Sequence, residues 1–582
     1  MTRTDEQLWP FNRIDKRKFN LAIQNLEMSG NLVEGTRLNG ETCKDNGTGQ
    51  SFSNELAAVA CSLLVFTVVN RSVSVIRSDW GWPYIIMFAG FVLACLVFRG
   101  PRTSQVSLPT SIILRLIALL LGAYALLSGI TYPAGVSTHT DSLLFATNIV
   151  MLVGAIGAVA VFWYPAFVLL PCAAVLAQKM LASQLFGISI SRTDYIPVVE
   201  MGLFLGISLC VLAPSRSYLP FRLGRMIAAA DIKVTTTLLF LVAVGAHFAN
   251  YFYSGLEKLA LGGGPFLWVT TNPTEVLSLV SWHSGFLPTG HLAGVSLISI
   301  EAAGFLRPFI NVSILLAQLG SVVFILRRRS MILATLFYDL THVVIYLVSG
   351  IFFWKWILLN LGLVAAMRKL PRWVETPRPM LLAATMVLLA PIAFQIARLG
   401  WYDTPALTRS DLYAVTKDGR ELQVPSNYFG TVSVTAAQHR LGRIAEGHYP
   451  TITWGSTQSG KVFLDALDDC SFGSDEPVQF GSDPDRVIRI VQLTHAYALQ
   501  RAASDGHYRY DRFPHHIWSN PWLFDEFAAL APDEISHYLY RTVSGCVRPG
   551  PEGPVMEVQF RDEIEIPVAT AFELSRSKDR SE

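Results

Sequence analysis

The side chains best suited to chemistry lie in one short stretch of an otherwise apolar chain. His247, Tyr251, Gly255 and Lys258 are spaced so that a helix would align them along one stripe. Removal from water disfavours the charged form of a lysine, and a neutral amine is a usable general base or nucleophile. Gly255, without a side chain, would let a ligand approach the backbone. The alternative is a Lys258 that reaches the membrane interface beside Glu257.

A second stripe consists of Tyr338, His342 and Tyr346, with Asp339 beside it. Residues spaced four apart share one face of a helix. A buried imidazole on that face could orient a polar ligand or pass a proton. Hydrogen bonding between helices is the alternative interpretation.

The elements that must position these residues are membrane helices. Of 582 residues, 51% are hydrophobic and 15% are charged, against about 25% charged in a typical soluble domain. A net charge of +2 gives no field that would attract nucleic acid. A helix crosses the hydrocarbon core with about 20 residues, so we predict about eleven spans. They lie near 55–76, 81–98, 110–131, 142–163, 165–181, 194–213, 232–256, 308–326, 331–349, 351–367 and 379–398. Residues 275–306 are expected to form interfacial or re-entrant helices.

The predicted fold is mainly α: a polytopic transmembrane helical bundle over 55–398, with a C-terminal soluble α+β domain over 399–582. Basic residues in short loops mark the cytoplasmic side of a membrane. Arg222, Arg328 and Arg368 represent three such loops. They predict an inner (plasma) membrane protein whose N-terminal segment, 1–54, is cytoplasmic and whose C-terminal domain is extracytoplasmic. Cys470 and Cys546 could then form a disulfide.

The lysine motif resembles that of a known family. Tyr251-Phe-Tyr-Ser-Gly-Leu-Glu-Lys-Leu259 resembles the Tyr-Phe-x-Ala-Gly-x-x-Lys-Leu run of the vitamin K-dependent γ-carboxylase and its bacterial relatives, the HTTM family. The spacing from His342 to Gly350 and Phe352 is similar to that family's histidine-containing helix, and Trp268 also fits. The resemblance covers about 60–370.

The resemblance implies a quinone-dependent enzyme that needs no metal. Lys258 would be the base that deprotonates a reduced quinone, and His342 would lie in the quinone pocket. With O2 the quinone would then yield a strong base that removes a proton from a peptidyl glutamate, to which CO2 adds. One departure is that the family's Asn-His-Ser-Tyr context reads Arg192-Thr-Asp194-Tyr195 here. The residues expected to bind substrate are His247, Tyr251, Gly255, Trp268, Tyr338 and Tyr346.

Two other functions remain open from the sequence. The bundle could be a non-enzymatic scaffold, or a maturation or export factor for a secreted peptide partner; Lys258→Arg would then be silent. A transporter would use Glu200, Lys258 and Asp339 as an ion path, although no inverted repeat is apparent. In every case the partners expected are the lipid bilayer and a peptide or protein at the C-terminal domain.

Overall fold

The computed structural model describes most of the chain after residue 47. The described residues are 48–76, 81–188, 196–213, 221–261, 264, 266–444, 447–448, 455–466, 470, 479–480, 482–510, 516–517, 519–570 and 573. The chain divides into two compact units, Met1–Gln50 and Ser51–Glu582. The second unit contains nearly all of the described residues. Nearly all of the predicted cytoplasmic segment 1–54, and the Arg192 to Tyr195 context, lie outside the described residues.

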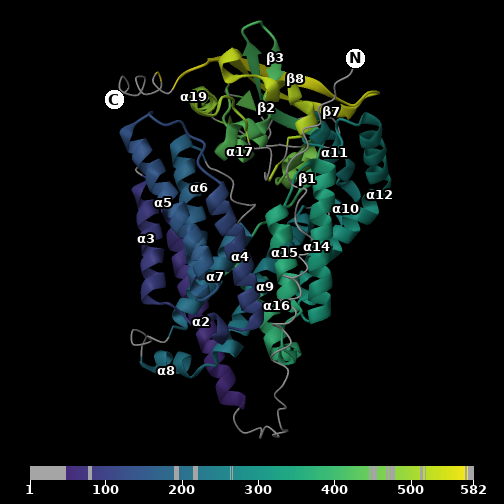
Figure 1. The fold of residues 1–582 in the computed structure, drawn as a ribbon. Helices are drawn as coiled ribbons and strands as arrows, with labels where there is room; N and C mark the ends of the chain where they lie inside the picture. The colour runs from purple at the N-terminus through teal and green to yellow at the C-terminus, as the bar shows by residue number, and fades with distance from the viewer. Residues whose placement is uncertain are drawn as a thin grey trace, which may run out of the picture. The chain divides into compact units, whose positions relative to one another are not determined.

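Most of the second unit is helical (Figure 1). Within the described residues, seven helical segments are long and apolar enough to cross a membrane. They belong to α2 (Thr48–Val75), α4 (Leu108–Leu127), α5 (Thr138–Ala160), η3 (Pro165–Val168) with α6 (Leu169–Phe186), α9 (Ile232–Leu259), α12 (Ala293–Leu319) and α14 (Arg328–Ser349). Four more apolar helices are shorter: α3 (Trp82–Val97), α7 (Ile196–Val211), α15 (Trp354–Met367) and α16 (Pro377–Ala393). The predicted helical bundle is therefore present, but about eleven spans are not confirmed, because these four helices fall short of the length that a full crossing needs.

The prediction for the stretch before residue 308 is wrong in its boundaries. After α11 (Thr274–His283) the chain turns, and α12 then runs unbroken from Ala293 to Leu319 with Pro308 inside it. A proline removes one main-chain donor from a helix. In lipid no water competes for the remaining main-chain hydrogen bonds, so the helix continues. Pro308 therefore does not break the helix.

The helix α9 is the central element of the bundle, and α12 is a peripheral one. Asp231 caps the start of α9, its Oδ1 accepting a hydrogen bond of 2.8 Å from Val234 N. From Thr235 to Tyr251 every side chain of α9 is buried. By contrast, α12 presents Phe305 and Phe309, which are 87% and 74% exposed. Large apolar side chains exposed in this way are expected where a helix faces lipid.

The C-terminal region contains an antiparallel sheet of four strands in the order β3-β2-β7-β8. The strands are β2 (Ala406–Thr416), β3 (Glu421–Gln423), β7 (Ile535–Pro549) and β8 (Pro554–Pro567). The long helix α19 (Pro484–Asp505) packs on it through Val487 and Ile490. Short pairs join β1 (Tyr402–Asp403) to β5 (Ser456–Thr457), and β4 (Gly447–His448) to β6 (Gln479–Phe480). Cys470 and Cys546 form a disulfide.

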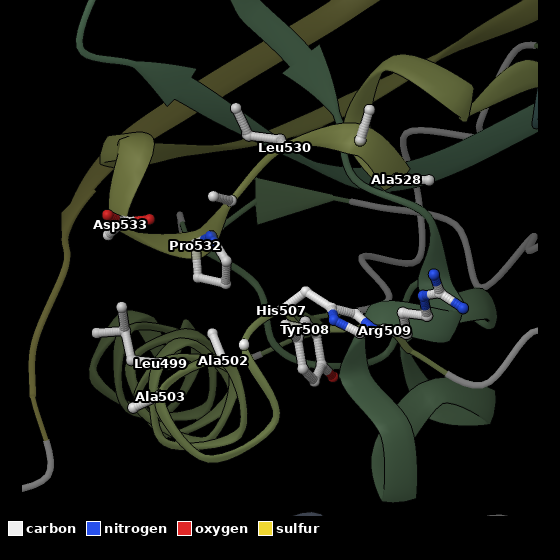
Figure 2. A pocket seen from close by; sticks show the side chains of 13 residues that line it. Leu499, Ala502, Ala503, His507, Tyr508, Arg509, Ala528, Leu530, Pro532 and Asp533 are labelled. Atoms are coloured by element: carbon white, nitrogen blue, oxygen red, sulfur yellow. The ribbon is translucent and has the colours of Figure 1, made fainter.

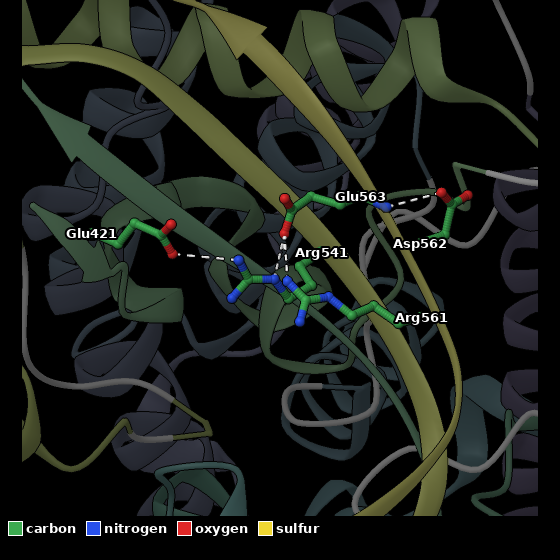
Figure 3. Close-up of polar contacts among 5 residues, drawn as sticks. All are labelled: Glu421, Arg541, Arg561, Asp562 and Glu563. Atoms are coloured by element: carbon green, nitrogen blue, oxygen red, sulfur yellow. Dashed lines mark hydrogen bonds and ion pairs between the residues drawn. The ribbon is translucent and has the colours of Figure 1, made fainter. Parts of the chain in front are cut away.

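Charged side chains link three strands on one face of this sheet (Figure 3). Arg541 on β7 pairs with Glu563 on β8, and its Nη2 lies 3.3 Å from Glu421 Oε2 on β3. Arg561 Nη2 lies 3.3 Å from Glu563 Oε2. Opposite charges on neighbouring strands favour one register over its alternatives, but exposed pairs contribute only about 1 kcal/mol or less each. These pairs favour the observed register but contribute little to the stability of the sheet.

Loops of the helical part bond directly to the C-terminal region. Phe352 N donates to His516 O at 2.7 Å, and Asn520 N donates to Gly285 O at 2.8 Å. Thr131 N donates to Thr431 Oγ1 at 2.8 Å. These contacts fix the end of the bundle against the sheet region, so residues from both can line one site.

Candidate functional site

A cavity of about 180 Å³, here called the bundle cavity, lies among α9, α12, α14, α15 and the chain that follows α16. Its lining is mainly apolar and aromatic. Five of the predicted site residues line it: Tyr251, Lys258, Trp268, Tyr338 and His342. An apolar cavity of about 150 Å³ is known to hold benzene, so this one has room for a small aromatic ring.

Lys258 forms one polar end of the bundle cavity. Its side chain is 3% exposed, so the amine does not extend into solvent. Nζ donates to Ser254 O at 3.3 Å and to Leu399 O at 3.1 Å, and it lies 5.0 Å from the centre of the Trp268 ring. The Trp268 ring is fixed by its Nε1, which donates to Trp401 O at 3.1 Å. The amine is thus held in a place poor in water, with an aromatic face beside it.

Asp403 lies at the same end of the cavity and was missed by the sequence analysis. It is 1% exposed, and its Oδ2 accepts a hydrogen bond of 2.9 Å from Asn272 Nδ2. Oδ1 has no hydrogen-bond partner among the described residues. Burial raises the pKa of this carboxyl to about 8, against opposing effects from Asn272, Lys258 and Trp401. The only signal in the sequence is an acidic residue just after the last apolar helix.

His342 lies on another wall, which aromatic rings dominate. Its ring centroid lies 5.1 Å from that of Phe353 and 6.0 Å from that of Tyr251, and its Nδ1 has no partner among the described residues. The rings of Tyr251 and Tyr338 stack with centroids 3.8 Å apart and an interplanar angle of 13°. The stacked pair provides a flat surface against which an aromatic ligand would pack.

His247 lies behind this wall and does not line the bundle cavity. Its Nε2 donates to Asn360 Oδ1 at 2.7 Å, since an amide oxygen only accepts. Asn360 Nδ2 in turn donates to Tyr251 OH at 3.2 Å and to Asp339 Oδ1 at 2.7 Å. His247 therefore supports the ligand-facing Tyr251 through Asn360, a residue that the sequence analysis did not single out.

Two further predicted site residues have other surroundings. A Cβ on Gly255 would lie 3.1 Å from Gln318 Cβ and from Leu319 Cδ2, so the space beside this glycine is filled by α12 and not open to a ligand. The expectation for Gly255 is thus wrong: its missing side chain lets two helices approach closely. Tyr346 packs against Phe352, with ring centroids 4.7 Å apart, and it is not part of the cavity lining.

The chain leaves α16 as a non-helical segment, 394–401, whose main chain is bound by polar side chains of the bundle. Asn250 Oδ1 accepts from Ala397 N at 2.8 Å, and Ser254 Oγ accepts from Leu399 N at 3.2 Å. Glu200 Oε2 accepts from Gln395 N at 2.9 Å. Irregular backbone at membrane depth needs such partners. These bonds explain the buried polar residues Glu200, Asn250 and Ser254, of which Asn250 and Ser254 also line the bundle cavity.

A second hollow, here called the outer pocket, lies in the C-terminal region and has a volume of about 570 Å³. Figure 2 shows Leu499 and Ala502 of α19 on one side, Pro532 on another, and His507 and Arg509 beside them. It is formed by loops and a helix end, and it is separate from the bundle cavity. Its lining is more polar than that of the bundle cavity.

Family models, curated proteins and solved structures were compared with the chain. None of them matches it. The resemblance in the lysine and histidine helices therefore rests on the sequence of those helices alone. Among the described residues, no group of three or more His, Cys, Asp or Glu side chains could hold a metal ion.

Proposed function

We propose that this chain is an integral membrane enzyme of the γ-carboxylase-like HTTM class, in which Lys258 acts as general base on a reduced quinone or another apolar hydroxy compound. The observation that carries the proposal is that Lys258, His342, Tyr251, Tyr338 and Trp268, which come from separate elements, line one apolar cavity. When bound, the reduced quinone would supply, with O2, the strong base needed for CO2 addition to a peptidyl glutamate.

The lining of the bundle cavity fits a ring with a polar group. The unpartnered Asp403 Oδ1 and His342 Nδ1 are buried atoms that a polar ligand group would satisfy. The Tyr251 and Tyr338 stack offers a flat contact. Phe337 and Val344 line the cavity and are also 36% and 45% exposed. An apolar tail could therefore leave the cavity along α14.

The chemical work assigned to the chain is proton removal from the ligand hydroxyl. Two carbonyl acceptors and the Trp268 ring hold the Lys258 amine in position, and the surrounding apolar walls keep water away. An amine removed from water is more often neutral at neutral pH, and a neutral amine has the free lone pair that a general base needs. His342 would orient the ligand from another wall of the cavity.

We assign the C-terminal region to the extracytoplasmic side, where it would present a peptide or protein substrate. The Cys470–Cys546 disulfide supports this side, because disulfides persist in oxidising compartments. The outer pocket is the proposed place for the peptide. The basic loops near Arg328 and Arg368 would then face the cytoplasm of an inner (plasma) membrane.

The test uses the purified full chain in lipid nanodiscs, supplied with a chemically reduced prenylated naphthoquinone, and measures oxygen consumption. Lys258→Ala should abolish the hydroquinone-dependent rate while the protein still inserts and elutes as the wild type does. Lys369→Ala, which removes an exposed lysine beyond α15, is the matched control and should be unaffected. Full activity in Lys258→Ala would refute the assignment of the base.

One observation favours a second candidate, the non-enzymatic scaffold or maturation factor. The Lys258 amine donates to Leu399 O and so fastens the segment that leads to the C-terminal region. An arginine could make such bonds but cannot act as a base, because it stays protonated. If Lys258→Arg keeps the full function of the chain in its host, the scaffold is the better account; loss of function with normal folding favours the enzyme.

A further inference from the structure

Lys258 and Asp403 face the same space without bonding to each other. Both line the bundle cavity, and each carries a charge that influences the other. No ion pair among the described residues joins Lys258 to Asp403, although both side chains are buried. A buried amine and a buried carboxylate that do not pair leave both with unused hydrogen-bonding capacity, which is costly unless something lies between them.

The Asp403 carboxyl is held rigidly with one oxygen left open. Asn272 binds it twice: Nδ2 donates to Asp403 Oδ2 at 2.9 Å, and Oδ1 accepts from Asp403 N at 2.8 Å. Asn311 Nδ2 donates to Asn272 O at 3.0 Å, and Thr274 Oγ1 donates to Asn311 Oδ1 at 2.6 Å. This buried chain of amides fixes Asp403 from the end of α10 (Leu267–Thr271), α11 and α12, so its open Oδ1 is part of a built site and not a chance orientation.

We propose that Asp403 is the second proton-holding group of the site: its Oδ1 and Lys258 Nζ flank the hydroxyl group of the cavity ligand and take up its proton as a pair. This rests on the proposed function and names its ligand more narrowly, as a ring-bearing compound with an ionisable hydroxyl. Before the step the ligand is O–H, and the pair holds one transferable proton, as ammonium with carboxylate or as amine with carboxylic acid. Afterwards the ligand is O⁻, and the pair is ammonium with carboxylic acid; the O–H bond of the ligand breaks, and one N–H or O–H bond forms on the pair.

The charge balance favours a pair over a lone lysine. A lysine that accepts a proton in an apolar cavity creates an ammonium beside the new oxyanion, and these two charges stabilise each other. A carboxyl that takes up a proton as the ligand ionises adds a hydrogen-bond donor beside the oxyanion, which a lone lysine does not supply. The raised pKa of Asp403 makes its neutral form accessible near neutral pH. The other charged groups that face the pair are Glu275 near Asp403 and Glu257 near Lys258.

The probe for the test is 1-naphthol, a redox-stable ring whose neutral and ionised forms differ in absorption. The full chain in nanodiscs is titrated with pH, and binding and the ionised fraction of bound naphthol are measured together. Wild type should ionise bound naphthol at a pH about one unit or more below that of free naphthol, a tenfold change in equilibrium. Asp403→Asn should bind naphthol within about threefold of wild type but return the ionisation midpoint upward by about one unit.

The matched control is Glu257→Gln, which removes a carboxylate next to Lys258 on the exposed side, where it lies 4.0 Å from Arg398. Solvent screens this half-exposed charge, so the variant should shift the midpoint by much less than Asp403→Asn does. An unchanged midpoint in Asp403→Asn would overturn the pair while leaving Lys258 as the base. Failure of wild type to bind naphthol, or full ionisation in Lys258→Met, would overturn the proposed function itself.

A measurement on the wild type covers the case in which Asp403→Asn does not fold. The pair predicts that the infrared spectrum of the naphthol-bound protein at neutral pH contains a protonated-carboxyl band, either carried over from the free protein or formed on binding. Glu257→Gln should keep that band. Its absence from the wild type, with naphthol bound and ionised, would refute the role of Asp403 without any variant at that position.

Discussion

Replacement of Asn360 by leucine tests whether the polar network behind Tyr251 stabilises the bundle. Asn360 is fully buried and bonds to three side chains: His247, Tyr251 and Asp339. Leucine has the same branching and the same number of side-chain heavy atoms, so the change removes the bonds without leaving a cavity. It leaves three polar atoms without their partner in an apolar interior, and Asp339 then has no partner on either oxygen, because its Oδ2 already has none among the described residues.

The free-energy cost of losing these hydrogen bonds differs between soluble cores and membrane bundles. In a soluble core each buried polar group left unsatisfied costs about 1–3 kcal/mol. Between membrane helices a hydrogen bond contributes only about 0.6 kcal/mol on average, because the unfolded state in the membrane also finds partners. The three bonds of Asn360 at the membrane value give about 2 kcal/mol. Since this network is remote from the lipid-exposed surface, we expect a loss of about 2 kcal/mol or more.

The assay is unfolding of the purified chain in mixed micelles by increasing the fraction of sodium dodecyl sulfate, followed by tryptophan fluorescence. Asn148→Leu is the control, because Asn148 is exposed on α5 and should tolerate leucine without loss. If Asn360→Leu loses less than about 0.5 kcal/mol, below one average membrane hydrogen bond, the network does not stabilise the bundle. The inference that His247 acts by supporting Tyr251 would then fail.

The remaining predictions concern helix packing and pH. A Cβ on Gly245 would lie 2.5 Å from Ala383 O, so Gly245→Ala should separate α9 from α16 and cost about 1–3 kcal/mol in the same unfolding assay. The control is Gly90→Ala, whose Cβ meets nothing within 4 Å and should leave the stability unchanged. Burial lowers the pKa of His439 to about 4, so its contribution to stability is full above the ordinary value near 6.5 and is lost as pH falls to about 4. A pH series of thermal unfolding should show a steep loss in that window, and His439→Gln should flatten it; an unchanged slope would mean that this histidine is not the group responsible.

The sequence predicted best the parts of the site that a single helix sets. Helical spacing put Tyr251 with Lys258, and Tyr338 with His342, and the cavity brings both pairs together. It failed for Gly255, because spacing along α9 does not reveal which neighbouring helix fills the space beside a glycine.

The missed residues are those that tertiary packing brings to the site. Asn360 lies on α15 in an ordinary apolar helix, and Asp403 lies beyond the bundle in a two-residue strand. Neither has a local pattern, since their partners are distant in the chain. The start of α12 was misplaced for another reason: polar residues and turn formers such as Pro288, Gly290 and Glu301 indicated interfacial or re-entrant helices over 275–306, whereas one helix begins at Ala293.

The segment 394–401 has a mechanical consequence. It joins the bundle to the sheet region while Asn250, Ser254 and Lys258 bind its main chain, and Asp403 follows it directly. A segment whose main chain is bonded at such short intervals cannot move independently of the bundle. A tilt of the sheet region relative to the bundle would therefore displace Lys258 and Asp403 together.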